Sequence, residues 1–104
     1  MTAVELAVEA KRRLAQVYGP RLRGVVLHGS QARGDARPGS DTDLLVLVDH
    51  PGGVLEEIRA TNAALYPLEL EADRLLDAHV VDADAFEAAE YEIFRRAQRE
   101  GVRL

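Results

Sequence analysis

The chain contains no cysteine. This absence excludes a disulfide framework, a zinc site built on thiolates and a catalytic cysteine. The first residues, MTAVELAVEAKRRL, lack the basic-then-apolar order of a signal peptide, and no apolar run approaches membrane-spanning length. We therefore expect a cytoplasmic protein without membrane association.

Lysine is nearly absent too, since twelve of the thirteen basic residues are arginine and only Lys11 is lysine. Acidic residues outnumber basic ones, and the formal net charge is −5. A protein that grips a nucleic-acid backbone needs an excess of lysine and arginine, so we expect no direct nucleic-acid binding. A single nucleotide can still bind, because that depends on local groups only.

The length of 104 residues suits one domain, residues 1–104, and a hydrophobic fraction of 47% is enough for a core. Little room remains for a separate substrate-recognition module. If the chain is an enzyme acting on a large substrate, we expect the substrate, a partner chain or a second copy of the chain to complete the site.

Apolar periodicity and turn residues predict alternating helices and strands. The connection between the first two strands is too short for a crossover helix, so we expect antiparallel or mixed pairing there and an α+β fold with a small mixed sheet flanked by helices. The predicted helices are 2–18, 54–66 and 83–100, with one or two turns at 30–34; the predicted strands are 23–28, 42–48 and 75–81; the predicted loops are 35–40 and 49–53.

The ends and inner faces of the helices follow from particular residues. Thr2 and Glu5 predict a capping box, Pro67 is expected to end the second helix, Asp82 to cap the last helical region and Gly101 to end it. The positions expected to face the core are Val4, Ala7, Val8, Leu14, Val17 and Tyr18 in the first helix, Val54, Leu55, Ile58 and Leu65 in the second, and Phe86, Ile93, Phe94 and Ala97 in the last.

Two carboxylates begin the most apolar strand. Side chains alternate along a strand, so Asp41 and Asp43 face the same side. Close carboxylates raise each other's pKa unless a cation lies between them, and Mg²⁺ is the cation that prefers oxygen ligands. The alternative is a solvated turn in which Ser40 and Asp41 act as caps.

A glycine and a serine end the preceding strand. Gly29 allows a ligand to approach the backbone, and Ser30 adds a hydroxyl to the free N–H groups of a short helix, which attract phosphate. The alternative is an ordinary strand-to-helix turn with a serine cap. Since both motifs lie at strand ends joined by one loop, we expect a phosphate-binding turn and a carboxylate pair to meet at one edge of the sheet.

The run Gly29-Ser30-Gln31-Ala32-Arg33-Gly34, followed after five residues by Ser40-Asp41-Thr42-Asp43-Leu44, resembles the G-S-x-x-R-G … S-D-x-D-L signature of the DNA polymerase beta-like nucleotidyltransferase superfamily. The chain length is similar to that of the minimal nucleotidyltransferases of bacteria and archaea. The resemblance implies the nucleotidyltransferase fold, with the strand pattern extending the match to roughly residues 22–81.

The resemblance also implies roles for individual residues. Gly29 and Ser30 would bind the β- and γ-phosphates of ATP, with Ser40 beside them. Asp41 and Asp43 would hold two Mg²⁺ ions, one orienting the leaving pyrophosphate and the other activating the acceptor hydroxyl. Arg33 would either contact phosphate or brace the loop.

Members of this superfamily usually carry a third acidic residue on a later strand. Asp77 is the first choice for this catalytic and metal-binding role, because it interrupts the apolar run LLDAHVV. Asp73 and Glu71 are the alternatives. His28, at a strand end, is expected to pack or cap, with a contact to the nucleotide as the alternative. His79 shares a strand face with Asp77 and is expected to cover the sheet edge, with support of the site as the alternative.

Three functions remain open from the sequence. Minimal nucleotidyltransferases of this kind resemble antitoxins paired with a helical toxin of the HEPN ribonuclease class, which implies transfer of AMP from ATP to a tyrosine of that toxin. A second possibility is a module that neutralises a partner protein by contact, with a vestigial nucleotide site. A third is an enzyme that modifies a small molecule such as an aminoglycoside, with a dimer supplying the missing wall.

Overall fold

The strands pair into one mixed sheet in the order β3-β2-β1-β4, in a computed structural model that describes residues 1–37 and 40–104. β1 pairs antiparallel with β2 and with β4, whereas β2 pairs parallel with β3, so the predicted α+β class and the mixed pairing are confirmed. In chain order the elements are α1 (Ala3–Tyr18), a 3-10 turn η1 (Gly19–Arg21), β1 (Leu22–His28), α2 (Ser30–Arg33), β2 (Thr42–Val48), α3 (Val54–Ala72), β3 (Leu76–Asp82), α4 (Ala83–Glu87), α5 (Glu92–Glu100) and β4 (Val102–Arg103).

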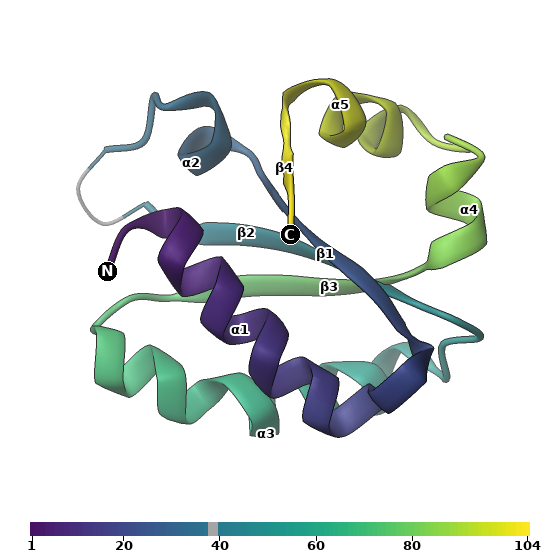
Figure 1. Ribbon diagram of the computed structural model, residues 1–104, viewed down its shortest axis with the longest axis horizontal. Coiled ribbons are helices and arrows are strands. Elements are labelled where there is room, and N and C mark those ends of the chain that lie inside the picture. The colour runs from purple at the N-terminus through teal and green to yellow at the C-terminus, as the bar shows by residue number, and fades with distance from the viewer. Residues whose placement is uncertain (38–39) are drawn as a thin grey trace.

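Helices cover both faces of the sheet (Figure 1). α1 and α3 share one hydrophobic cluster with Val25, Leu27, Leu44 and Val46. α4 and α5 form the second cluster on the other face. The alternation of side chains along each strand therefore decides which of the two layers a residue faces.

The capping box of α1 is present, because Glu5 N–H donates to Thr2 Oγ1 and Thr2 N–H donates to Glu5 Oε1. The predicted inner face was partly wrong. Ala7, Leu14 and Tyr18 are buried, but the core also takes Leu6 and Ala10. Val4, Val8 and Val17 are exposed, because the helix turns its leucine and alanine stripe inward.

The prediction that Pro67 ends the second helix was wrong, because α3 continues to Ala72 with Pro67 inside it. A proline in a helix interior costs about 3 kcal/mol, since it removes one backbone hydrogen bond. Leu65 and Leu68 lie on either side of Pro67 and are both buried against α1. Burying two leucines contributes roughly 1.5–3 kcal/mol each, enough to offset that cost.

The inner face predicted for the start of α3 was also wrong. Only Leu65 of the predicted set is buried, and Val54, Leu55 and Ile58 are exposed. The buried polar residues Glu57 and Thr61 take the inner positions, and Glu57 Oε1 accepts a hydrogen bond of 3.2 Å from the Tyr18 hydroxyl. Burial and the charge of Glu57 raise the pKa of Tyr18 to about 12, so the Tyr18 hydroxyl stays protonated at neutral pH and can donate this bond.

The last helical region is two helices, not one. The helix is interrupted between Glu87 and Glu92, where Ala89 adopts a left-handed φ of 53°. The break lets Phe86 of α4 and Phe94 of α5 meet edge to face at 5.6 Å between ring centroids. Ile93 is exposed, contrary to the prediction, and Asp82 makes no side-chain cap.

Three strand predictions were close, and one strand was missed. β2 has the predicted bounds, β1 begins one residue early and β3 lies one residue later than predicted. After Gly101 ends α5, β4 pairs with β1, and Lys11 Nζ donates a 2.7 Å bond to the carbonyl of Leu104. The predicted loop 35–40 includes residues 38 and 39, which lie outside the described residues. No described helix combines the length and apolar character that crossing a bilayer requires.

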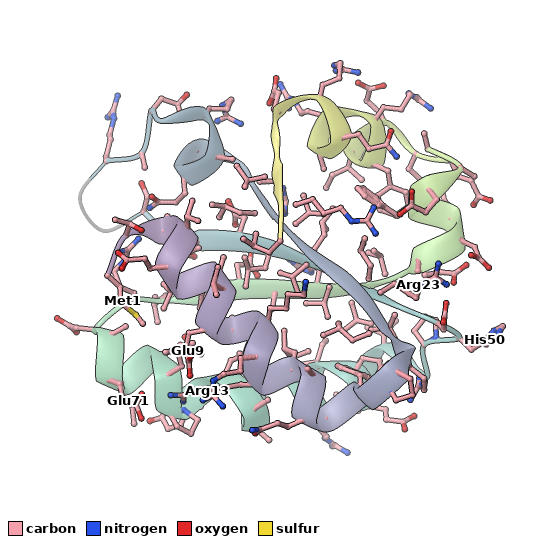
Figure 2. All side chains as sticks on the ribbon, in the orientation of Figure 1. Met1, Glu9, Arg13, Arg23, His50 and Glu71 are labelled. Atoms are coloured by element: carbon pink, nitrogen blue, oxygen red, sulfur yellow. The ribbon has the colours of Figure 1, made fainter. Side chains whose placement is uncertain are left out.

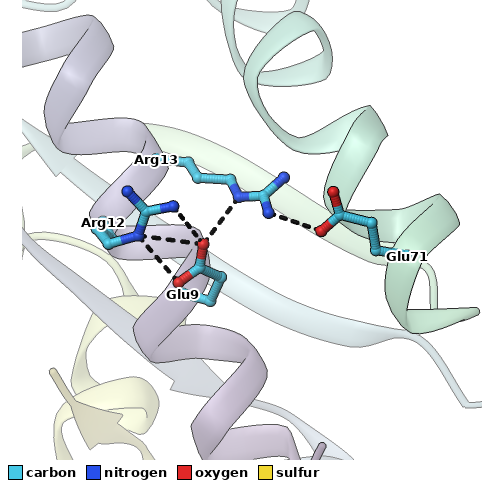
Figure 3. Close-up of polar contacts among 4 residues, drawn as sticks. All are labelled: Glu9, Arg12, Arg13 and Glu71. Carbon is cyan, nitrogen blue, oxygen red and sulfur yellow. Dashed lines mark hydrogen bonds and ion pairs between the residues drawn. The ribbon is translucent and has the colours of Figure 1, made fainter.

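Ion pairs join α1 to α3 (Figure 3). Arg13 Nη2 lies 2.7 Å from Glu71 Oε2, and Glu9 accepts bonds from both Arg12 and Arg13. The bonds from Arg12 and then Arg13 lower the pKa of Glu9 to about 2. The network lies at the surface, so its contribution to stability is small.

Replacing Pro67 by alanine should stabilise the fold, because α3 already runs through this exposed position and gains a backbone N–H. We expect the free energy of unfolding to rise by roughly 1–3 kcal/mol in urea denaturation. Tyr66→Ala is the matched control, since it removes an exposed neighbouring side chain and adds no N–H. A Pro67→Ala protein that unfolds at lower urea than the wild type would contradict this account.

Glu9→Gln should remove a pH-dependent part of the stability. The pKa of Glu9 is lowered from 4.5 to about 2, so its ionised form stabilises the fold above pH 4.5, and this contribution is lost as the pH falls toward 2. The wild type should exceed the variant slightly in urea midpoint at pH 7, with the gap closing on acidification and in about 1 M salt. A difference in urea midpoint that changes with neither pH nor salt would show that the ion pairs of Glu9 are not its cause.

Candidate active site

The register of the sheet places three polar side chains in one row. His28 ends β1 and lies opposite Asp43 of β2, which in turn lies opposite Asp77 of β3. Val26 and Leu45 lie two residues from His28 and Asp43 on the same strands, and they pack against α4 and α5. Because side chains alternate along a strand, the row points to that same face. The row forms at the end of the sheet where β1 passes into α2 (Figure 1).

The backbone at Gly29 touches this row. Its φ of 75° and ψ of −156° fall in a region that essentially only glycine adopts. A Cβ atom on Gly29 would collide with Oδ2 of Asp43. The glycine-serine turn and the carboxylate of Asp43 are therefore in direct contact.

The environment of Asp43 disfavours its charge. Burial raises its pKa above 3.8, and repulsion from Asp77 and Asp41 adds to the rise, against the opposing effect of His28 and His79. Three carboxylates that repel one another at one edge of a sheet are stabilised by a cation.

His28 ends β1 and is partly buried there, which matches the packing at a strand end that the sequence predicts. Its Nε2 atom is buried and has no hydrogen-bond partner within the described residues. Burial lowers the pKa of His28 and so favours the neutral ring. A buried nitrogen without a partner costs free energy unless a ligand satisfies it. The residue-by-residue register that sets His28 opposite Asp43 was not predicted from the sequence.

Asp77 and His79 form a second polar pair on the edge strand β3. His79 Nε2 lies 3.1 Å from Asp77 Oδ1, and both side chains are at least half exposed. His79 therefore contacts the carboxylate that the sequence predicts as the third acidic residue.

Ser40 and Asp41 lie where the loop enters β2. Ser40 Oγ accepts a 3.0 Å bond from Arg37 N–H, and the Ser40 carbonyl accepts one from Gln31 Nε2 of α2. These contacts tie both ends of the loop together beside the turn at Ser30. Asp41 is exposed and precedes the strand by one residue.

Arg33 braces α2 in this structure. Its guanidinium lies 3.3 Å from Asp35 and 3.8 Å from Glu100 at the end of α5. Of the two alternatives that the sequence left open, bracing matches these contacts.

The two alternative third carboxylates lie elsewhere. Figure 2 places Glu71 beside Arg13 and Glu9, in the α1–α3 layer on the opposite face of the sheet. Asp73 follows α3 in a left-handed conformation with φ 52°. Asp77 alone of the three is in register with Asp43.

The donor set suits a hard cation only in part. Within residues 1–37 and 40–104, no group of three or more acidic or histidine side chains is gathered closely enough to hold a metal ion. Asp43 and Asp77 supply carboxylate oxygens, with Asp41 on the same side. Mg²⁺ usually takes one or two carboxylates and completes its shell with phosphate oxygens and water, so these residues fit Mg²⁺ when a nucleotide is bound.

A family model described as a nucleotidyltransferase domain matches residues 8–101. The chain belongs to this nucleotidyltransferase domain family. No curated protein matches it. The matched range of the nucleotidyltransferase domain contains the whole row and the glycine-serine turn.

Two solved structures have the same fold. One, described as a candidate nucleotidyltransferase from Sulfolobus solfataricus, is 21% identical with a TM-score of 0.61, over 99% of this chain and 86% of that one. The other is a toxin–antitoxin structure with AMP-PNP, 20% identical with a TM-score of 0.62, over 91% of this chain and 69% of that one. At these identities the likeness establishes the nucleotidyltransferase fold.

Asp43→Asn should stabilise the metal-free protein. Because the folded state raises the pKa of Asp43, ionisation of this group lowers stability once the pH rises above 3.8. The asparagine variant should melt at a higher temperature than the wild type at pH 7 in EDTA, whereas an average substitution destabilises by about 1 kcal/mol. The two proteins should converge as the pH falls below 3.8.

Asp41→Asn is the matched control, because this neighbouring carboxylate is exposed. We expect its free energy of unfolding to change by no more than about 0.5 kcal/mol, so its melting temperature should change little. A lower melting temperature for Asp43→Asn at pH 7 would show that the carboxylate is satisfied by contacts in the folded state.

Proposed function

We propose that this protein transfers a nucleoside monophosphate, AMP from ATP, to a hydroxyl group of a protein acceptor. The contact between Gly29 and Asp43 carries the proposal, because it joins a phosphate-binding turn to the carboxylate row. Membership of the nucleotidyltransferase domain family supports the same reaction.

In this reaction the acceptor oxygen attacks the α-phosphorus of ATP, the bond to the β-phosphate breaks, and pyrophosphate leaves. Gly29 and Ser30 bind the β- and γ-phosphates through backbone N–H groups and the hydroxyl. Asp41, Asp43 and Asp77 would hold Mg²⁺, and the ion would neutralise charge at the phosphates and lower the pKa of the attacking hydroxyl. The Ser40 carbonyl accepts a hydrogen bond from Gln31 Nε2 of α2, which keeps Ser40 close to the turn at Ser30.

The acceptor that we propose is a tyrosine of a HEPN-type toxin, so that the protein acts as an antitoxin. The likeness to a toxin–antitoxin structure with AMP-PNP supports this choice. The exposure of the row also supports a macromolecular acceptor, since Asp77 and His79 lie on an edge strand and are at least half exposed.

Neutralisation by contact alone is the second candidate. It is favoured by the absence of a three-ligand cluster among the described residues. In that case the carboxylates would contribute nothing to inhibition of the partner, and the Asp41→Asn, Asp43→Asn double variant would inhibit it in cells as well as the wild type does.

Calorimetry of ATP binding with and without Mg²⁺ tests the site. Because the described carboxylates do not close around a metal alone, we expect weak Mg²⁺ binding that strengthens with ATP present. Asp41→Asn with Asp43→Asn should weaken Mg²⁺-dependent ATP binding at least about tenfold, or about 1.4 kcal/mol. ATP binding that is indifferent to Mg²⁺, or to the double variant, would contradict the proposed metal site.

Transfer itself is tested by incubating the product of the adjacent gene with the protein, ATP and Mg²⁺. Intact mass spectrometry should show the partner gaining one AMP group on a tyrosine, and none with the double variant. Retained ATP binding with an unchanged partner mass would leave nucleotide binding standing and exclude that acceptor.

A further inference from the structure

β3 is an open edge of the sheet. Among the described residues it has a neighbouring strand on one side only, in the order β3-β2-β1-β4. No residue of Leu76–Asp82 is fully buried, whereas β2 is buried at every position except Asp43. β3 also contains neither proline nor lysine, two residue types that commonly protect an edge strand from pairing. Such an edge is able to accept a further strand.

The backbone of β3 offers hydrogen-bonding groups along this edge. Thr42 N–H donates to the carbonyl of Leu75, so odd-numbered residues of β3 direct their backbone groups to β2 and even-numbered ones direct theirs outward. The outward N–H of Leu76 is taken by a side chain of α3. Within the part of the chain that the structure describes, the outward groups of Ala78 and Val80 make no hydrogen bond. An added strand would bond to these two residues.

The carboxylate row ends at the same edge. His28, at one end of the row, is partly buried on a strand that β4 covers on its other side. Asp77 and His79, at the other end, have side chains that are 50% and 62% exposed. In a strand paired with β3, the residue opposite Asp77 would lie on the face of the row, with its Cβ about 5 Å from that of Asp77. An acceptor side chain at that position enters the row from its open end.

A hollow lies under the alternate positions of such a strand. It measures about 250 Å³ and is bordered by Val54 and Ile58 of α3 and by Ala78 and Val80 of β3. Ala78 and Val80 face the α3 layer, and residues paired with them would point the same way. The segment that fits this edge therefore carries an acceptor residue on one face and apolar residues on the other.

A second copy of the chain does not suit this edge. β3 reads Leu-Asp-Ala-His-Val-Val-Asp and carries no tyrosine, serine or threonine. Two copies paired edge to edge would therefore cover Asp77 without bringing a hydroxyl group to the row. They would also join two chains of net charge −5, which repel each other.

We propose that β3 binds an extended segment of the acceptor protein as an additional strand, with the acceptor tyrosine opposite Asp77 and apolar residues opposite Ala78 and Val80. This placement rests on the proposed function, because it states how the tyrosine reaches the row. The tyrosine oxygen bonds to the α-phosphorus of ATP, its proton passes to solvent, and pyrophosphate leaves. Backbone bonds supply affinity, and the alternate side chains supply specificity.

The probe is a synthetic peptide, Val-Thr-Val-Tyr-Val-Thr-Val with lysine at both ends, whose alternation is the same in either direction. Amide hydrogen exchange of the full chain, followed by NMR, measures docking without any need for activity. At millimolar concentration the peptide should slow exchange of the Ala78 and Val80 N–H groups at least about tenfold. The amides of Val102 and Arg103, on the other edge strand, are the control and should keep their rates.

Val80→Pro tests the same edge through the reaction. It removes one outward N–H and spares the bonds to β2, as an edge position allows. AMP transfer to the peptide tyrosine, measured by mass spectrometry with ATP and Mg²⁺, should fall at least about tenfold. Val80→Ala is the matched control, because it keeps the N–H and should retain most of the transfer. Both variants should bind ATP as the wild type does.

The outcomes separate the edge site from the proposed function. Unchanged exchange at Ala78 and Val80, or transfer that Val80→Pro leaves at the wild-type rate, would overturn the edge site and leave nucleotide transfer standing. Slowed exchange with no AMP on the peptide would overturn the placement of the tyrosine opposite Asp77. Slowed exchange with no transfer to the partner protein either would overturn the proposed function. A dimer that Val80→Pro dissociates in sedimentation would assign the edge to a second copy and overturn the proposal.

Discussion

The antiparallel pairing of β1 with β2 is the constraint on which the site depends. It sets the end of one strand against the start of the next, so that His28 faces Asp43 and the turn at Gly29 arrives beside the carboxylates. A parallel pairing would place the two motifs at opposite ends of the sheet. The short connection, which leaves no room for a crossover helix, therefore fixes the chemistry as well as the topology.

The site is assembled from groups that the fold alone does not favour. Gly29 occupies a backbone region open to almost no other residue, Asp43 is penalised for its charge, and His28 Nε2 is buried without a partner. A cation beside Asp43 or a hydrogen-bonding ligand at His28 Nε2 would lower the last two of these costs.

Strand identity, the antiparallel pairing and the glycine-serine and carboxylate motifs could be predicted from the sequence, because each depends on neighbours close along the chain. The failures share one cause. Pro67 stays in α3 because Leu65 and Leu68 are held by α1, and β4 exists because β1 has a free edge. The position of His28 opposite Asp43 likewise depends on the register across the sheet. Such long-range contacts leave no local pattern to detect.

Helical periodicity identifies an apolar face but not what that face contacts, and α3 illustrates the difference. Its inner side takes Thr61 and the paired Glu57 into the core, while Ile58 and Tyr66 remain outside. β3 connects that outer surface to the site, because its side chains alternate: Ala78 faces the α3 layer and Asp77 faces the carboxylate row.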